Sequence, residues 1–311
     1  MHTTIHVRAA IVIVSALAAL PLALALAGQE RNEDAARELA GAIDIHVHSD
    51  PDSRARSIDA IDVAKLARSK GMRGIVLKNH DDPTGGLAYI VRKEVPGLEI
   101  FGGIALNLAV GGINPVAVQH MTEVSGGWGR IVWMPTYDAE NHIRSGNENR
   151  PFVSVSRNGE LLPEVKQVIG LIAKNGLVLA TGHSSPAEGL MLVREGRRQG
   201  VQHMVVTHAT FTPVFMNVDQ MKEAAHEGAF IEFAGGSVSG AGGGARMDSF
   251  ADAIRKVGPE FCILSTDLGQ RGSPLPPDGF GAFLLAMRAR GFTEQEVDRM
   301  AKQNPAKLLG L

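Results

Sequence analysis

The sequence has almost no cysteine and no excess of charge of either sign. A single residue, Cys262, allows no intramolecular disulfide and no zinc site built from several thiolates. The 31 Lys and Arg stand against 33 Asp and Glu, so the chain lacks the basic excess that favours nucleic acids or anionic membrane surfaces. Apolar residues still make up 44% of the chain and charged residues 21%, so we expect most of it to fold.

Long apolar runs are also absent, with one exception at residues 9–27. A weakly basic start that includes Arg8 precedes this run, and the small residues at 25–27 (Ala-Leu-Ala) end it. This is the pattern of a secretory signal peptide that is cleaved after an A-x-A site. Pro21 supports this interpretation, because a proline inside the run would kink a membrane-spanning helix.

The alternative is an uncleaved anchor, because residues 9–27 approach the roughly 20 residues that span a bilayer. We favour cleavage. The expected organisation is then a signal peptide over residues 1–27 and one folded unit over residues 28–311. The protein is expected to be exported, to the periplasm or beyond, without stable insertion in a membrane.

Eight short β-rich runs alternate with segments that carry helix signals. Each run is continuous rather than alternating in its apolar residues, as in strands that are buried on both faces. The runs cover residues 42–48, 74–80, 98–106, 130–136, 177–183, 203–209, 229–235 and 261–267. Eight such repeats in about 270 residues match a (β/α)8 TIM barrel, whose usual size is roughly 250 residues. An open doubly wound sheet is the alternative, but one domain of that type rarely needs eight strands.

Helix signals between the runs include Ser57, which we expect to cap a helix that ends at Gly71, and Asn114 before a proline. Two segments depart from the repeat. Residues 152–162 alternate and turn at Asn-Gly, so we predict a β-hairpin insertion before the fifth barrel strand. The glycine-rich residues 235–244 lack the GK[ST] of a phosphate loop, and we interpret them as a mobile active-site loop.

Histidine is abundant in comparison with tyrosine: the chain has 11 His and 2 Tyr. In a (β/α)8 barrel, catalytic residues lie at the carboxyl ends of the strands. The polar residues at the ends of the predicted strands are His46, His48, Lys78, His80, His183, His208 and Asp267. By contrast, His120 and His226 fall in predicted helices, and His203 begins a strand. The strand-end set therefore predicts an active site at the mouth of the barrel.

His46 and His48 lie two residues apart on one strand, so their side chains point to the same face and can bind one metal ion. Neutral imidazoles and a carboxylate suit zinc and similar divalent ions. Protein ligands that leave one position open lower the pKa of a bound water toward about 7. Asp267 could ligate the metal, take the proton of this water and pass it to the leaving group. We expect one or two divalent ions, with Zn²⁺ favoured.

The same motifs resemble those of the amidohydrolase superfamily, over residues 41–311. They are the H-x-H of residues 44–48, His183, His208, the strand that ends at Asp267 and the N-P-A-K-L-L-G-L at 304–311. The strings VLKNH and VWMPT resemble an uncharacterised branch of that superfamily, so no substrate is implied. The resemblance implies that His46 and His48 are metal ligands and that Asp267 is a ligand and the general base. It implies that His183 and His208 are ligands, or that His208 stabilises the transition state.

The sequence departs from the superfamily at the fourth strand. Binuclear members usually carry a carbamylated Lys or a Glu there, as a bridge between two metals, whereas this strand ends at Thr136 without either residue. The nearest substitutes are Lys78 and, in the loop after strand four, Asp138, Glu140 and His142.

Lys78 has three interpretations: a carbamylated bridge, a cation that binds a substrate carboxylate, or the partner of a neighbour such as Asp81. The first two together are favoured, because a lysine at a barrel mouth is costly without a partner. His80, Asn107 and His142 are further candidates for contact with substrate.

Two further features are the polar segment after the first strand and the single cysteine. The polar residues 50–56 could hold substrate, but we favour a solvent-exposed turn. Cys262 begins the eighth strand and is interpreted as an inert buried thiol.

The leading functional hypothesis is a metal-dependent hydrolase that acts on a small amide, cyclic amide, lactone or ester. A metal-dependent decarboxylase or other lyase is the second, and the missing strand-four bridge favours it mildly. The third is a non-catalytic periplasmic protein that binds a metal or a solute. The expected partner is a small-molecule substrate and no nucleic acid, and a homo-oligomer is left open.

Overall fold

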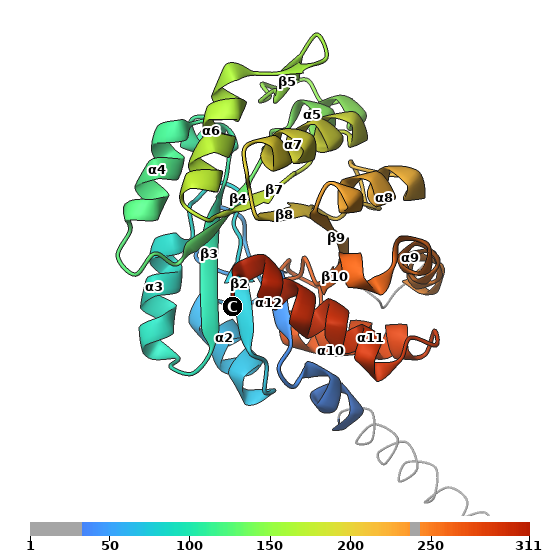
Figure 1. The fold of residues 1–311 in the computed structure, drawn as a ribbon. Helices are drawn as coiled ribbons and strands as arrows, with labels where there is room; N and C mark the ends of the chain where they lie inside the picture. Colours follow the sequence, from blue (N-terminus) through green and yellow to red (C-terminus); the bar gives the residue numbers. More distant parts are fainter. Residues whose placement is uncertain (1–32, 237–242) are drawn as a thin grey trace, which may run out of the picture.

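All eight β-rich runs form parallel strands in the computed structural model, which describes residues 33–236 and 243–311 (Figure 1). The strands are β1 (Ile43–Val47), β2 (Gly74–Leu77), β3 (Glu99–Ala105), β4 (Gly129–Trp133), β7 (Val178–Ala180), β8 (His203–Val206), β9 (Ala229–Ala234) and β10 (Cys262–Ser265). Each pairs in parallel with its neighbour, in the order β1-β2-β3-β4-β7-β8-β9-β10.

The two outer strands of this order meet just beyond their carboxyl ends. The main-chain nitrogen of Asp267 donates to the carbonyl oxygen of His46 at 2.9 Å, and that of His48 donates to Leu268 at 2.8 Å. These bonds join the segment after β10 to β1 and close the sheet at the mouth. The predicted (β/α)8 barrel is therefore confirmed, and its closure brings Asp267 beside the H-x-H motif.

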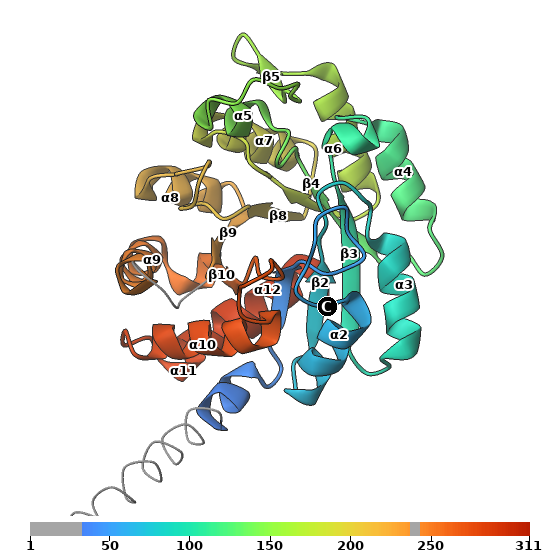
Figure 2. The same ribbon diagram turned by 180° about the vertical axis from the view of Figure 1, so that it is seen from behind.

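Helices surround the strands, as Figures 1 and 2 show from opposite sides. They are α2 (Ala60–Ser69), α3 (Gly85–Glu94), α4 (Pro115–Glu123), α5 (Glu140–Ser145), α6 (Pro163–Lys174), α7 (Pro186–Arg198), α8 (Val218–His226), α9 (Gly243–Val257), α10 (Pro276–Arg288), α11 (Glu294–Asp298) and α12 (Asn304–Leu309). Residues 33–39 are also helical, and a π-helical turn at Arg299–Gln303 joins α11 to α12.

The core has two parts, one between the strands and the helices and one inside the barrel. The inner part includes Ile45, Phe101 and Ile263 from the strands and Leu308 and Leu309 from α12. The helix α12 contacts β1, β8 and β10, so it covers the amino-terminal end of the barrel with apolar side chains. The interior is thus filled from one end, and the polar strand-end residues gather at the other.

Local signals account for several element boundaries. Asn114 caps α4 as predicted, with its side chain accepting from Val116 N and Ala117 N. The prediction for α2 was wrong: Asp59, not Ser57, caps this helix, since its carboxylate accepts from the nitrogens of Ile61 and Asp62. A carboxylate at a helix amino terminus also meets the positive end of the helix dipole, which favours it over a hydroxyl.

The predicted hairpin insertion is confirmed. Strands β5 (Ser156–Arg157) and β6 (Glu160–Leu161) pair antiparallel, ahead of the fifth barrel strand β7. Asn158 and Gly159 between them have φ of 53° and 80°, the left-handed conformation that a two-residue Asn-Gly turn requires.

Three predictions concern the termini and the glycine-rich loop. The expected signal peptide (1–27) and its alternative, an anchor over 9–27, lie outside the described residues, and so do residues 237–242 of the predicted mobile loop. In the part of the chain that is described, none of the helices has the length and apolar character that a membrane span requires.

Candidate active site

Five of the predicted strand-end histidines form a closed ring of side chains at the carboxyl end of the barrel. The imidazole centroids are 5.3 Å apart for His46 and His48, 4.9 Å for His48 and His80, and 6.3 Å for His80 and His183. His183 lies 4.8 Å from His208, which lies 6.1 Å from His46. All five are buried. The histidine ring, as these five are called below, thus joins residues from four strand ends.

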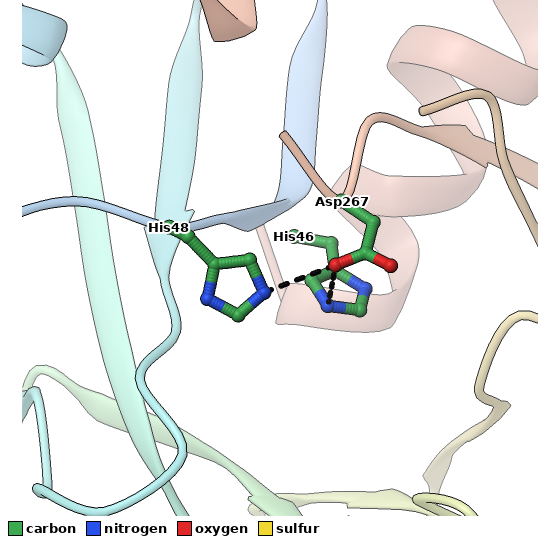
Figure 3. Close-up of side chains that lie close together, drawn as sticks. All are labelled: His46, His48 and Asp267. Atoms are coloured by element: carbon green, nitrogen blue, oxygen red, sulfur yellow. Dashed lines mark hydrogen bonds and ion pairs between the residues drawn. The ribbon is translucent and has the colours of Figure 1, made fainter. Parts of the chain in front are cut away.

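Asp267 joins the two histidines of the H-x-H motif, as Figure 3 shows. Its Oδ1 lies 3.1 Å from Nε2 of His46 and 3.0 Å from Nε2 of His48. Asp267 has φ of 54°, and His208, after β8, has φ of 23°. Non-glycine residues in this left-handed region carry about 1–3 kcal/mol of backbone strain each, which is common at functional sites.

His46 is oriented by a carboxylate that the sequence analysis missed. Its Nδ1 lies 3.0 Å from Oε1 of Glu232 on β9, and a carboxylate only accepts, so Nδ1 carries a proton and Nε2 is the nitrogen that faces Asp267. Glu232 also accepts from the hydroxyl of Ser265 at 2.7 Å and from His208 N at 2.8 Å. The available signal was a single charged residue inside the apolar run 229–235.

The two carboxylates beside His46, those of Glu232 and Asp267, favour its protonated form. Burial and Lys78 lower the pKa of His46, but Asp267 and Glu232 outweigh them and raise it to about 9. Burial would raise the pKa of Glu232, yet its contacts with His46 and His208 lower it to about 2. Although burial opposes it, proximity to His46 likewise holds the pKa of Asp267 well below its usual range. Both carboxylates are therefore ionised.

The donor set fits a divalent metal ion. The ligand atoms of His46, His48 and Asp267 all lie within 4.8 Å of one another. Nε2 of His46 faces the Asp267 oxygen at 3.1 Å, and because Glu232 keeps a proton on Nδ1, a divalent ion would displace the Nε2 proton and bind between these two atoms. Burial lowers the pKa of His48 to about 3, so its imidazole is neutral and able to ligate.

Lys78 contacts the candidate metal ligands through His46 and does not lie beside Asp81. Its Nζ is 2.9 Å from Nε2 of His46 and 5.6 Å from the ring centroid of Trp133. Burial lowers its pKa to about 8. Asp81 instead accepts from Ser53 at 2.8 Å and pairs with Arg54. The interpretation of Lys78 as the partner of Asp81 is therefore wrong.

His80 and Asn107 belong to a buried network around Thr136, the residue that ends the fourth predicted strand. Nδ1 of His80 lies 2.9 Å from the Thr136 hydroxyl, to which the Asn107 amide donates at 2.7 Å. The same amide group donates to the carbonyl oxygen of His80 at 2.9 Å. A direct contact between Asn107 and substrate would have to break one of these bonds.

Of the three substitutes proposed in the strand-four loop, only His142 reaches the histidine ring. Its Nδ1 lies 2.9 Å from Nδ1 of His183, with the two rings stacked. Asp138 instead pairs with Arg150. Glu140 pairs with Arg144 at the surface.

Tyr137, in the loop after β4, covers the histidine ring, and the sequence did not predict this contact. Its ring centroid lies 4.0 Å from that of His80, 5.3 Å from that of His142 and 5.7 Å from that of His183. The guanidinium carbon of Arg54 lies 4.4 Å from the centroid of the Tyr137 ring. In the sequence, Tyr137 is marked only by its position directly after the predicted fourth strand, residues 130–136.

The polar segment after β1 is mostly the solvent-exposed turn that we predicted, with Pro51, Ser53, Arg54 and Ala55 exposed, but one ion pair within it is buried. The side chains of Arg56 and Asp52 are 3% and 0% exposed and form an ion pair, with Arg56 Nε donating to Asp52 Oδ2 at 2.7 Å. The Arg54 side chain is half exposed. The segment is thus fastened by a buried ion pair and turns one cation toward the mouth. Cys262 is buried as predicted, and burial raises the pKa of its thiol.

Several solved structures share this fold at low sequence identity. An amidohydrolase from Pseudomonas aeruginosa is 12% identical, with 90% of this chain and 99% of that chain covered and a TM-score of 0.60. A triple mutant of an organophosphorus hydrolase from Deinococcus radiodurans is 16% identical, with 88% and 94% covered and a TM-score of 0.59. A 2,6-dihydroxybenzoate decarboxylase from Rhizobium is 13% identical, with 87% and 99% covered and a TM-score of 0.56.

These likenesses show that the chain shares its fold with these three enzymes, as the sequence motifs led us to expect. No curated protein sequence matches the chain. Residues 41–232, which contain the whole histidine ring and Glu232, match the family model described as "Family of unknown function (DUF6282)", and the chain belongs to that family.

Proposed function

We propose that the protein is a metal-dependent hydrolase of a small amide, cyclic amide, lactone or ester. The observation that carries the proposal is the meeting of Asp267 Oδ1 with Nε2 of both His46 and His48, while Glu232 holds the proton of His46 on the far nitrogen. Two imidazoles and an ionised carboxylate at one point are the ligands of a catalytic metal with an open position, and metal binding would displace the Nε2 proton of His46.

His46, His48 and Asp267 would hold the ion, with His183 and His208 as the adjoining ligands. When bound, a divalent ion supplies Lewis acidity, which polarises a carbonyl group and lowers the pKa of water. The nitrogen and oxygen donors suit Zn²⁺ best, although other divalent ions accept the same set.

The proton transfers fall to Asp267. It is ionised, and a quarter of its side chain is exposed at the mouth, so it can take a proton from an attacking water and return it to the leaving group. Burial lowers the pKa of His208 to about 4, so this residue is neutral and serves as a ligand or as a donor to the substrate oxygen. His142 and Tyr137 form the wall against which substrate would lie.

Lys78 is the residue best placed to bridge two ions. Its pKa, lowered to about 8, increases the fraction of neutral amine at neutral pH, and this amine adds to carbon dioxide to form a carbamate with release of one proton. Its contact with His46 places that nitrogen at the edge of the metal ligands. If Lys78 is the bridge, elemental analysis will give two ions per chain in the wild type and one in Lys78→Ala. One ion in both would rule out Lys78 as the bridge.

A second candidate is a metal-dependent decarboxylase. The 2,6-dihydroxybenzoate decarboxylase with the same fold favours it, together with the absence of a ligand at the end of β4. Product analysis separates the two reactions: release of carbon dioxide without addition of water would support the decarboxylase.

The hydrolase is tested with purified, zinc-loaded protein and a panel of amides, cyclic amides, lactones and esters. Asp267→Asn is expected to lower the rate by orders of magnitude while the chain stays folded, because the amide cannot take the proton. Asp252→Asn, on the exposed surface of α9, is the matched control and keeps full activity. Full activity of Asp267→Asn would reject the assigned role. A metal-loaded wild type that is inert to the whole panel would favour a non-catalytic binding protein.

We also propose that residues 1–27 are a signal peptide and that the protein is exported. The apolar run and the Ala-Leu-Ala at 25–27 support this. Sequencing of the mature amino terminus will give Gly28 if the peptide is cleaved, and an intact Met1 would contradict cleavage and favour the anchor.

A further inference from the structure

His80 belongs to the histidine ring, but its hydrogen-bond partner is of a different kind from that of His46. The Nδ1 of His46 faces a carboxylate, whereas the Nδ1 of His80 lies 2.9 Å from the hydroxyl oxygen of Thr136. A carboxylate only accepts, but a hydroxyl both donates and accepts. The tautomer of His80 therefore depends on where the hydrogen of the Thr136 hydroxyl goes.

Asn107 settles that direction. Its Oδ1 accepts from the main-chain nitrogens of Thr136 at 2.8 Å and Asp138 at 3.2 Å, which fixes the orientation of the amide group. Its Nδ2 must then be the atom 2.7 Å from the Thr136 hydroxyl, and it donates to that oxygen. One of the two lone pairs of the hydroxyl oxygen is used, and the hydroxyl hydrogen still needs an acceptor.

Within residues 33–236 and 243–311, Nδ1 of His80 is the only acceptor at hydrogen-bond distance from the Thr136 hydroxyl. Thr136 is fully buried, so bulk water does not replace it. If Nδ1 of His80 carried the proton instead, a buried hydroxyl hydrogen would be left without a partner, which folded proteins avoid. Complete pairing requires the lone pair of His80 on Nδ1 and its proton on Nε2.

We propose that His80 is a hydrogen-bond donor to the substrate, through Nε2–H, and not a metal ligand. A ligating nitrogen needs a free lone pair, and that of His80 is taken by Thr136. The two histidines thus differ at Nδ1: that of His46 carries a proton toward Glu232, whereas that of His80 accepts from Thr136, which leaves an N–H group on Nε2 of His80.

The position of His80 suits such a role. Its ring stacks on that of the ligand His48 and contacts that of Tyr137, and it lies between His48 and His183 in the ring. An N–H group here would stabilise the negative charge that develops on a carbonyl oxygen during attack by water. This part rests on the proposed hydrolase function and implies a substrate whose reacting group is a carbonyl. Thr136 and Asn107 are then positioning residues that act through His80.

The tautomer can be read without any substrate. The full chain is labelled with ¹⁵N-histidine, and the His80 signals are identified as those that vanish in His80→Gln. The proposal predicts a directly bonded proton on Nε2 and none on Nδ1, and a proton on Nδ1 would overturn it. Thr136→Val is expected to shift the Nδ1 resonance and Thr136→Ser to restore it. Thr181→Val removes another buried threonine hydroxyl, one bonded to Thr207 N, and leaves the His80 signals unchanged.

Metal content and kinetics test the role. His80→Leu is expected to keep the metal content of the wild type and to lose 10²–10³ in kcat, as for the loss of one oxyanion donor. His80→Gln, which retains an N–H group, recovers part of this rate. Loss of metal in His80→Leu, or an unchanged kcat, would overturn the assignment. If the wild type hydrolyses nothing, the proposed function fails, while the tautomer and the metal content still decide whether His80 is a ligand.

Discussion

Replacement of Glu232 by glutamine removes one charge and keeps the shape, and its consequences follow from three contacts. The carboxylate accepts from His46 Nδ1 at 3.0 Å, from Ser265 Oγ at 2.7 Å and from His208 N at 2.8 Å. The amide of Glu232→Gln has one accepting oxygen and one NH₂ group. In either orientation, the NH₂ group faces a donor in a place where water does not enter.

Two magnitudes can be derived from this arrangement. One unpaired buried donor costs about 1–3 kcal/mol of stability. Loss of the residue that orients a ligating histidine costs about 10–100-fold in metal affinity, because His46 is no longer held with its lone pair on Nε2. We therefore expect the metal-free variant to unfold at lower denaturant concentration and to bind Zn²⁺ about 10–100-fold more weakly.

The assay is zinc competition against a chromogenic chelator, with denaturant unfolding of the metal-free chain measured in parallel. Glu123→Gln is the matched control, since this carboxylate is exposed on α4, and it should change neither quantity. If Glu232→Gln binds zinc as tightly as the wild type, then Glu232 does not orient a metal ligand, and the assignment of His46 fails with it.

Three further predictions concern stability and reactivity. Arg56→Ala leaves the buried Asp52 carboxylate without its partner and is expected to cost about 3–5 kcal/mol in denaturant unfolding, whereas the half-exposed Arg54→Ala costs less than about 1 kcal/mol; equal losses would contradict the burial of the pair. Cys262 should react with a thiol reagent only at the rate of unfolding, because it is buried with a raised pKa, and rapid labelling of the native chain would refute this. Gly182→Ala, at φ of 62° and with its new Cβ 2.2 Å from a main-chain oxygen, should displace the neighbouring His183 and lower metal content and stability together; wild-type values of both would be the contrary result.

The fold, and the side chains that gather at the candidate site, could be predicted from the sequence for one physical reason. Continuous apolar runs predict buried parallel strands, and parallel strands in a barrel bring all their carboxyl ends to one mouth. Residues as far apart as His48 and Asp267 could therefore be placed together without knowledge of any loop, and they lie 3.0 Å apart.

What the sequence could not supply depends on side-chain direction and on loop paths. Glu232 lies within a strand, and only the barrel geometry turns its carboxylate toward His46. The burial of Arg56 depends on how the loop after β1 folds back over Asp52. Tyr137 reaches the histidine ring because the loop after β4 bends across it. Each outcome is decided by tertiary contacts rather than by periodicity.

The central claim is that carbonyl hydrolysis depends on a metal held by His46, His48 and Asp267. Its most direct test is the hydrolysis rate of the purified protein before chelation, after chelation and after return of Zn²⁺. The account predicts loss of the rate with the metal and recovery when zinc is restored. A rate that survives complete removal of the metal would contradict it.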